Sequence, residues 1–517
     1  MLPPRSLPSM DDFLVEGLSE VEPAYGTFEA EGRMYAGQLP MVWLNGGPGC
    51  SSFNCGVMFE NSPVTVPLRP AGYARTSARE PFEYNENAWT KATAMLYVEQ
   101  PVGVGFSTGG PDPEKEADLA GDFYIFLQNF FQVFDTYQSS KLFIVGESYA
   151  GYFAPSIAYK IFKEQKKLDD TSDIAINLAG VGLGNGWANA MVQGPATIDY
   201  GYWHGLYDEH TRQALHAEWN HCINSPKDEE EPTPFHKVNP PDDCGMMLAP
   251  LMAGGKGVWD DNLNGPNAYD VTTWDGYPVI LGGNSSIENF FNDPRVKEKL
   301  HAPEDVFWRG CIPGAGRRLQ EARRFLGLLE NDQPMSTVPY LAEMLDGGVR
   351  VLIYNGDRDL STNAQGSEML LNGMEWSGAE EWFTTPRGLW VNPKNSKDKT
   401  PAGYAKSLKG LDFVVIYNSG HLVPYNQPEN ALDLITRFIK NESYYDRPLP
   451  SFDFYHKTRN PGTTLANGMY PLMPPDNSQS KNNHHGLNVA LTAISSFVAG
   501  AAVTSFFMGP RGGYQKL

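Results

Sequence analysis

The stretch Phe143-Ile144-Val145-Gly146-Glu147-Ser148-Tyr149-Ala150-Gly151 joins an apolar run to a serine that is flanked by small residues and followed by a helical pattern. The pattern G-x-S-x-A/G between a strand and a helix is typical of a nucleophile elbow, a sharp turn that holds the serine in strained backbone. Larger side chains at Gly146 or Ala150 would collide with neighbouring atoms in such a turn. A neutral turn serine is the alternative, but the strand before Ser148 and the helix after it favour a nucleophile.

Short apolar runs recur on both sides of this turn, and each ends in residues rich in Gly, Asn or Asp. Many lead into helical patterns, so we predict an α/β class with a mostly parallel central sheet and crossover helices. The predicted strands cover residues 41–44, 94–98, 142–145, 176–183, 349–354 and 413–417. Residues 189–335 break this rhythm with prolines, an acidic run and mixed helical patches, which predicts an insertion that caps the sheet.

Two predicted strands downstream of Ser148 end in polar residues that can activate a serine. A serine hydroxyl is a poor nucleophile until a base takes its proton, and a carboxylate usually orients that base. Residues 351–354 lead into Asn355-Gly356-Asp357-Arg358-Asp359, and residues 414–417 lead into Asn418-Ser419-Gly420-His421. The pattern predicts His421 as the base and leaves either aspartate as the orienter. A turn-capping aspartate and a loop histidine are the alternative interpretation.

A glycine-dense loop follows another predicted strand, in the segment Trp43-Leu44-Asn45-Gly46-Gly47-Pro48-Gly49-Cys50-Ser51-Ser52. Glycines expose backbone N–H groups, so the loop can donate a hydrogen bond to an oxyanion while Tyr149, the residue after the serine, supplies the second donor. A phosphate cradle is the rival interpretation. The sequence lacks the G-x-x-x-x-G-K-[ST] pattern that a phosphate cradle would need.

Composition narrows the class of protein. The chain has 517 residues, 41% of them apolar, which can bury a large core and excludes disorder as the main architecture. Its 40 basic and 61 acidic residues give a net charge of 40 − 61 = −21, so nucleic acid is not an expected partner. The five cysteines form no CxxC pair or zinc-type cluster, and we predict neither a structural metal nor a cofactor.

The C-terminal part carries a candidate membrane segment. Residues 487–508 hold no charge and can span a hydrocarbon core of about 30 Å, which predicts a transmembrane helix; a buried or interfacial helix is the alternative. Basic residues in 509–517 predict a cytoplasmic tail and a lumenal catalytic domain. Residues 448–486, rich in Pro, Asn, Ser and Gly, predict a stalk. The N-terminal segment, residues 1–27, begins without the apolar region of a signal peptide.

Five motifs occur together in an order that resembles the serine carboxypeptidase family. They lie at residues 43–52, 98–107, 146–155, 356–359 and 420–424. The resemblance implies an α/β-hydrolase fold with a core of residues 28–188 and 336–447, and with the insertion at 189–335 as its cap. The added C-terminal span is similar to that of the membrane-anchored, pheromone-processing carboxypeptidases.

The resemblance implies a catalytic role for residues in these motifs. Ser148 is the expected nucleophile, His421 the base, and Asp359, the second aspartate of G-D-x-D, the orienter. The N–H groups of Gly47 and Tyr149 are the expected oxyanion hole.

A substrate C-terminus is expected to bind beside the elbow. The resemblance implies Asn45, Glu147 and Glu60 as its carboxylate site, with one residue more before Glu60 than the family's usual spacing. Two buried glutamates raise each other's pKa, so in mild acid both can be neutral and donate hydrogen bonds. A helix-capping role is the alternative for Glu147. Thr362 and Leu422 are expected to line the pocket for the departing residue, and Leu422 favours an apolar one.

The family pattern also implies a disulfide between Cys50 and Cys311, which would tie the glycine loop to the end of the cap. A second disulfide is expected between Cys222 and Cys244 within the cap. Cys55 then remains as a free thiol.

These observations predict a serine-type carboxypeptidase that removes C-terminal residues from peptides and proteins through an acyl-enzyme, in an acidic medium. The alternatives are an esterase or acyltransferase on the same scaffold and a catalytically idle lumenal binding protein. The sequons at Asn284 and Asn441 would accept glycans, which fits a secretory location in the Golgi, vacuole or lysosome, or at the cell surface. Peptide C-termini are the expected partners, with the membrane contacted through the C-terminal helix.

Overall fold

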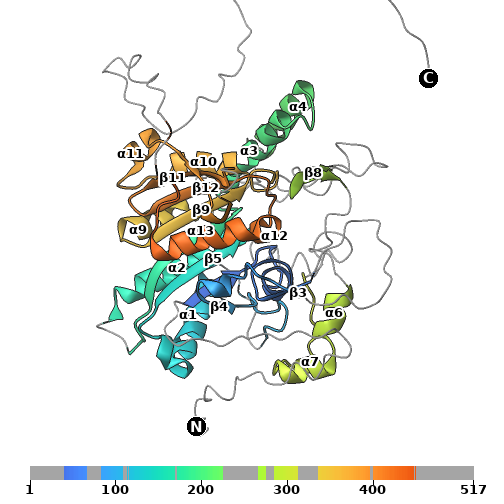
Figure 1. The fold of residues 1–517 in the computed structure, drawn as a ribbon, viewed down its shortest axis with the longest axis vertical. Helices are drawn as coiled ribbons and strands as arrows, with labels where there is room; N and C mark the ends of the chain where they lie inside the picture. Colours follow the sequence, from blue (N-terminus) through green and yellow to red (C-terminus); the bar gives the residue numbers. More distant parts are fainter. Residues whose placement is uncertain are drawn as a thin grey trace, which may run out of the picture. The chain divides into compact units, whose positions relative to one another are not determined.

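An eight-stranded sheet forms the centre of the structure, in the order β10-β11-β12-β9-β6-β5-β1-β4 (Figure 1). Neighbouring strands from β4 to β12 are parallel, whereas β12, β11 and β10 pair antiparallel. The strands are β1 (Pro40–Leu44), β4 (Ala94–Tyr97), β5 (Lys141–Glu147), β6 (Asn177–Gly184), β9 (Arg350–Gly356), β10 (Gly388–Trp390), β11 (Gly403–Leu408) and β12 (Leu411–Ile416). The computed structural model describes residues 40–66, 83–108, 113, 116–168, 172–224, 266–274, 285–311, 336–395, 400–446 and 449.

Strand β5 illustrates how the sheet is buried on both faces. Successive side chains of a strand point to opposite faces, so Leu142 and Ile144 join one hydrophobic cluster while Phe143 and Val145 join the other. All four are at most 1% exposed. A parallel sheet covered on both faces needs such uninterrupted apolar strands, and this is why the central strands are conspicuous in the sequence.

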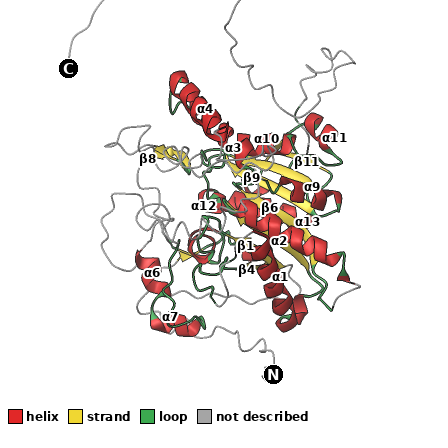
Figure 2. Ribbon diagram, turned by 180° about the vertical axis from the view of Figure 1, so that it is seen from behind, coloured by secondary structure: helices red, strands yellow, loops and turns green. Residues whose placement is uncertain are grey.

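Helices cover the two faces of the sheet. Figure 2 shows α1, α2 and α9 in front of the strands, and Figure 1, from the opposite side, shows α13 there. Helix α13 begins with a proline at its first turn, buries Leu434, Ile435 and Phe438 against the sheet, and ends at Asn441 in left-handed backbone (φ 59°). The helices of the core are α1 (Glu116–Val133), α2 (Ala150–Gln165), α9 (Val338–Asp346), α10 (Ala364–Asn372), α11 (Ala379–Thr384), α12 (Val423–Asn426) and α13 (Pro428–Lys440).

The predicted insertion is described in two parts. Helix α3 (Ala190–Trp203) follows β6 and packs against α4 (Glu209–Asn224). Further along the chain come a hairpin and two short helices: β7 (Pro266–Asn267), β8 (Asp270–Trp274), α6 (Ser285–Phe291) and α7 (Pro294–Lys299). The remaining short elements are β2 (Val64–Thr65), β3 (Glu83–Tyr84), and the 3-10 helices Trp89–Lys91, Asp135–Tyr137 and Pro393–Asn395. Residues 225–265, 275–284 and 312–335 lie outside the described ranges, so the cap boundaries 189–335 remain a prediction.

All six predicted strands are present, which confirms the α/β class. Strands β10 and β11 were not predicted. Strand β10 has 3 residues, and β11, Gly-Tyr-Ala-Lys-Ser-Leu, mixes polar and apolar side chains and is only partly buried. Antiparallel strands near a sheet edge do not need the continuous apolar run that marks a central parallel strand.

No helix within the described ranges is long and apolar enough to cross a membrane. The predicted transmembrane segment 487–508, the tail 509–517 and the N-terminal segment 1–27 lie outside those ranges, as does the stalk 448–486 apart from Leu449. These assignments therefore stay predictions.

Candidate active site

Ser148 lies at the sharp turn between β5 and α2. Its backbone is left-handed (φ 63°), a conformation that a serine adopts only where its surroundings hold it. Its N–H donates to Gly184 O (3.1 Å), and its carbonyl accepts from Gly151 N (2.9 Å) and Trp187 N (2.8 Å). A Cβ on Gly146 would lie 2.7 Å from the Cβ of Ala150, so the small residues that flank the serine are sterically required, as predicted.

The glycine loop after β1 rests directly on this turn. A Cβ on Gly46 would collide with the backbone N of Tyr149 and would lie 2.7 Å from Glu147 O. Gly47 has φ +113°, which side chains rarely adopt. Because residue 46 is glycine, the loop backbone can lie against the N–H of Tyr149, the residue that follows Ser148.

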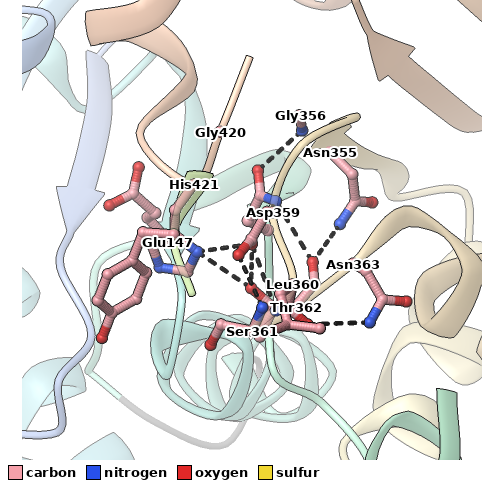
Figure 3. A network of polar contacts seen from close by, with 12 residues as sticks. Glu147, Asn355, Gly356, Asp359, Leu360, Ser361, Thr362, Asn363, Gly420 and His421 are labelled. Atoms are coloured by element: carbon pink, nitrogen blue, oxygen red, sulfur yellow. Dashed lines mark hydrogen bonds and ion pairs between the residues drawn. The ribbon is translucent and has the colours of Figure 1, made fainter. Parts of the chain in front are cut away.

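His421 and Asp359 form a buried pair. They follow β12 and β9, which are neighbouring parallel strands, so both emerge at the same edge of the sheet. His421 Nδ1 lies 2.7 Å from Asp359 Oδ2, and the side chains are 4% and 0% exposed (Figure 3). Asp357 instead accepts from the backbone N–H of Ser419 (3.1 Å). Of the two candidate aspartates, Asp359 is the one that contacts the histidine.

Further donors surround the Asp359 carboxylate. Asn185 Nδ2 (2.7 Å) and Thr362 Oγ1 (2.8 Å) donate to Oδ2, and Ser361 N (2.9 Å) donates to Oδ1. Thr362 Oγ1 also lies 3.2 Å from His421 Nδ1. Donors on both oxygens stabilise the charged carboxylate at a site without solvent.

Glu147 and Glu60 form a second buried group, each 2% exposed. Asn45 connects to it: its Oδ1 accepts from Trp43 Nε1 (2.7 Å) and Gly56 N (3.2 Å), which directs its Nδ2 to Glu147 Oε1 (3.4 Å). The structure therefore brings the three predicted carboxylate-binding residues together. Figure 3 shows Glu147 in the same close view as His421.

Both glutamates hold protons more tightly than usual. Burial raises the pKa of Glu147 well above its ordinary value, and the negative charges of Glu60 and Asp359 raise it further. Burial also raises the pKa of Glu60, to about 7, against the lowering effects of Glu147, His421 and Asn45. The charge of each carboxyl therefore affects the titration of the other, and burial favours the neutral form of both.

A π-helix, η3 (Phe53–Glu60), delivers Glu60 to this group. Its backbone hydrogen bonds span five residues, from Val57 N to Ser52 O (3.2 Å) and from Asn61 N to Gly56 O (3.1 Å). A π-turn holds one residue more than an α-turn. The wider winding of η3 therefore helps to set where Glu60 lies at its end.

Comparison with known proteins identifies the chain. Residues 25–441 match the family described as serine carboxypeptidase, peptidase S10. The chain belongs to the serine carboxypeptidase family. This match covers the described core and both groups of buried polar residues.

Several relatives span the same region. The pheromone-processing carboxypeptidase kex1 of Aspergillus clavatus is 32% identical over 413 residues, which are 78% of this chain and 62% of that protein. Serine carboxypeptidase S10 family member 2 of Dictyostelium discoideum is 32% identical over 415 residues, 79% of this chain and 68% of that protein. The match to the Aspergillus relative thus covers about 62% of the relative's length.

A solved structure shares the fold. Kex1(delta)p, a prohormone-processing carboxypeptidase from Saccharomyces cerevisiae, matches with a TM-score of 0.63 at 24% identity, over 78% of this chain and 83% of that chain. The likeness supports the α/β-hydrolase fold that the motifs imply for this carboxypeptidase-family chain.

The disulfide expected from the family, between Cys50 and Cys311, is present and confirms that prediction. Ser51 N also donates to Gly310 O (2.8 Å), so the glycine loop is joined to the end of the insertion. Cys55 is a free thiol, 1% exposed, as predicted.

The other modification sites are only partly described. Cys244 and Asn284 and the side chain of Cys222 lie outside the described residues, so the Cys222–Cys244 disulfide and glycosylation at Asn284 stay predictions. Asn441 is exposed at the end of α13, and its side-chain oxygen accepts from Arg350 Nη1 (3.4 Å), so glycosylation there also stays a prediction. Within the described ranges, no cluster of three His, Cys, Asp or Glu could hold a metal ion.

Three residues that the sequence analysis did not single out contact the Asp359–His421 pair: Ser361 through its backbone N–H, Asn185 and Tyr269. Asn185 contacts Asp359 through its side chain. The sequence could have pointed to Asn185, because it is a polar residue between two glycines directly after a predicted strand. Tyr269 accepts from His421 N (2.8 Å), and its ring lies 4.7 Å from the imidazole. It carried no signal, because it belongs to the β7–β8 hairpin of the insertion and reaches the site only through tertiary packing.

Proposed function

We propose that the chain is a serine-type carboxypeptidase that removes single residues from peptide C-termini through an acyl-enzyme. One observation carries the proposal: a strained serine at an elbow directly follows a buried glutamate with a raised pKa, and a buried Asp359–His421 pair lies at the same sheet edge. Family membership supports it.

In the proposed reaction, His421 is the base and Ser148 the nucleophile. Because Nδ1 of the imidazole faces Asp359, Nε2 is the nitrogen left to take the Ser148 proton. The serine oxygen attacks the scissile carbonyl carbon, and the protonated His421 then gives its proton to the departing amine. Water repeats the sequence on the ester, with His421 again as base, and releases the shortened peptide.

The oxyanion of each tetrahedral intermediate would bind at the backbone N–H groups of Gly47 and Tyr149. The close approach of the glycine loop to Tyr149 N supports this assignment. These donors are fixed before the reaction, so they stabilise the developing charge without reorganisation.

The substrate's terminal carboxylate would bind at Glu147, Glu60 and Asn45. Protonated carboxyl groups and the Asn45 amide can donate hydrogen bonds to it, whereas ionised glutamates would repel it. The raised pKa values of both glutamates support neutral donors in mild acid.

The departing side chain would contact Leu422. This residue is 5% exposed and belongs to an apolar cluster that includes Phe59 and Trp308, which supports an apolar departing residue. The hydroxyl of Thr362 is directed to Asp359, so we place Thr362 with the aspartate rather than in this pocket.

Paired substrates test the function. Kinetics on one peptide that ends in free leucine and on the same peptide as its amide, from about pH 4 to pH 8, should show that KM rises with pH only for the free acid. A fluorophosphonate should label wild-type protein at Ser148 and should not label S148A. Equal turnover of both peptides at every pH would indicate an esterase or general acyl hydrolase, and failure to label would indicate an idle protein.

We also propose that residues 487–508 anchor the enzyme in a membrane of the secretory pathway, with 448–486 as the tether. The uncharged sequence supports the anchor, and the Cys50–Cys311 disulfide fits an oxidising compartment. Full-length protein should resist carbonate extraction from membranes. Extraction like a soluble protein would contradict the anchor.

A further inference from the structure

The turn after β6 connects the nucleophile to the orienter. Gly184 O accepts the N–H of Ser148 (3.1 Å), and Trp187 N donates to the Ser148 carbonyl (2.8 Å). Between them, Asn185 N donates to Tyr354 O in β9 (2.8 Å). This turn is thus hydrogen-bonded both to the elbow and to the strand that carries Asp359.

The side chain of Asn185 has one possible orientation. It is 0% exposed, and its Oδ1 accepts from Gly356 N (3.0 Å). An amide oxygen that accepts from a backbone N–H leaves the NH2 group on the other side, where it donates to Asp359 Oδ2 (2.7 Å). The left-handed backbone of Asn185 (φ 43°) aims the amide at this point.

Asp359 Oδ2 therefore accepts from three side chains at once. They are His421 Nδ1 (2.7 Å), Asn185 Nδ2 (2.7 Å) and Thr362 Oγ1 (2.8 Å). A donor to a carboxylate stabilises its charge and weakens it as an acceptor for the next donor. The attraction between Asp359 and a protonated His421 is consequently smaller than it would be for an oxygen that accepted from His421 alone.

We propose that Asn185 and Thr362 are positioning residues that moderate Asp359, so that His421 stays uncharged, and able to take the Ser148 proton, in more acidic solution. The proposal rests on the proposed roles of Ser148 and His421 but not on the choice of substrate. It goes beyond orientation, because it assigns the two side chains an effect on the pH at which the base works.

Other titratable groups face this pair from each neighbouring element. Those that act on the pair are Glu60 of η3, Glu147 of β5, Tyr200 of α3 and Tyr269 of the β7–β8 hairpin, and Cys55, Asp270, Asp357 and Arg358 act in turn on these tyrosines. All of them remain in the variants proposed below. A difference between a variant and the wild type therefore reports the lost donor.

The test measures the rate at which a neutral fluorophosphonate labels Ser148 from about pH 4 to pH 8. Asn185→Gly suits the left-handed backbone and removes the amide, and Thr362→Val keeps the side-chain shape and removes the hydroxyl. Each variant should move the acid limb of the rate profile upward by about one pH unit, and the double variant by more, whether or not the plateau falls.

Asn363→Ala is the matched control. Asn363 is equally buried in the same loop, where it donates to Leu360 O (3.1 Å) and accepts from Gly366 N (2.8 Å). It makes no hydrogen bond to Asp359 or His421 in the described part of the chain, so its loss should lower stability and leave the limb in place.

The proposal would be overturned if both single variants had the same acid limb as wild type, even if their plateaus were lower. A merely structural role would lower the labelling rate at every pH and would not move the limb. Thr362→Val keeps the test open if Asn185→Gly fails to fold. Wild-type protein that is labelled but does not cleave peptides would instead contradict the carboxypeptidase proposal alone. Absence of labelling at Ser148 would contradict both.

Discussion

Replacing Glu60 by glutamine removes one of the two buried carboxyl groups beside the elbow. Burial raises the pKa of this group from its ordinary value of 4.5 to about 7. Glutamine keeps the shape and offers N–H donors at every pH. The change therefore separates hydrogen bonding to a substrate carboxylate from the loss of a proton.

The pKa shift sets the size of the expected effect on binding. If only the neutral pair binds a carboxylate, a group with a pKa of about 7 makes wild-type KM for a free-acid peptide rise about tenfold between pH 6 and pH 8. The KM of E60Q for the same peptide should change less than about twofold over this pH range. The peptide amide should show little pH dependence of KM in either protein.

The same pKa shift predicts that E60Q is more stable than wild type at neutral and higher pH. A raised carboxyl pKa means that the native state keeps a proton that the unfolded chain loses between about pH 4.5 and pH 7, so the free energy of unfolding falls as pH rises through this window. The rise in the pKa of Glu60 from 4.5 to about 7 corresponds to about 3 kcal/mol of unfolding free energy, at about 1.36 kcal/mol for each pKa unit. Urea unfolding should therefore find E60Q more stable than wild type above pH 7 and similar to it near pH 4.

Asp412→Asn is a matched control. Burial raises the pKa of Asp412 to about 6, but the residue lies at the start of β12, whereas His421 follows its end. Its removal should change the pH dependence of stability and leave KM unchanged. A tenfold rise of KM in E60Q, parallel to that of wild type, would refute the assignment of Glu60.

Three further predictions concern other parts of the molecule. Asp359→Asn should lower kcat by roughly 10⁴-fold because the histidine loses its buried partner, whereas Asp357→Asn should be much milder; the reverse order in folded proteins would contradict the geometry. Cys50→Ser, which breaks the bridge to Cys311, should lower the free energy of unfolding by about 2–5 kcal/mol in denaturant titrations, and an unchanged midpoint would argue against a structural role. Removal of residues 487–517 should release a soluble enzyme with unchanged peptide turnover; loss of activity would show that this segment contributes to the fold.

Local pattern was sufficient to predict the central strands and the elbow. A buried parallel strand needs a continuous apolar run, and a serine in a strand-to-helix turn needs small neighbours. Both requirements concern adjacent residues, so they are visible in residues 141–151 without any knowledge of the rest of the fold. Strands β10 and β11 escaped prediction because partly buried antiparallel strands at or next to the sheet edge do not face the same requirement.

The family resemblance extended the prediction beyond local pattern. It implied Asp359 over Asp357 and proposed Glu60 despite its unusual spacing. The residues themselves left both points open. Asp357 and Asp359 follow the same strand, so either could orient the histidine, and no local pattern marks Glu60.

Tertiary structure decided which polar groups meet. Asp359 reaches His421 because β9 and β12 are neighbours and the intervening loop turns Asp357 toward Ser419. Glu60 comes to the buried group at the end of the π-helix η3, and Tyr269 reaches His421 from an insertion far away in the sequence. Sequence determines what each segment can form by itself, but the direction of a buried side chain depends on the donors and packing that distant segments bring to it.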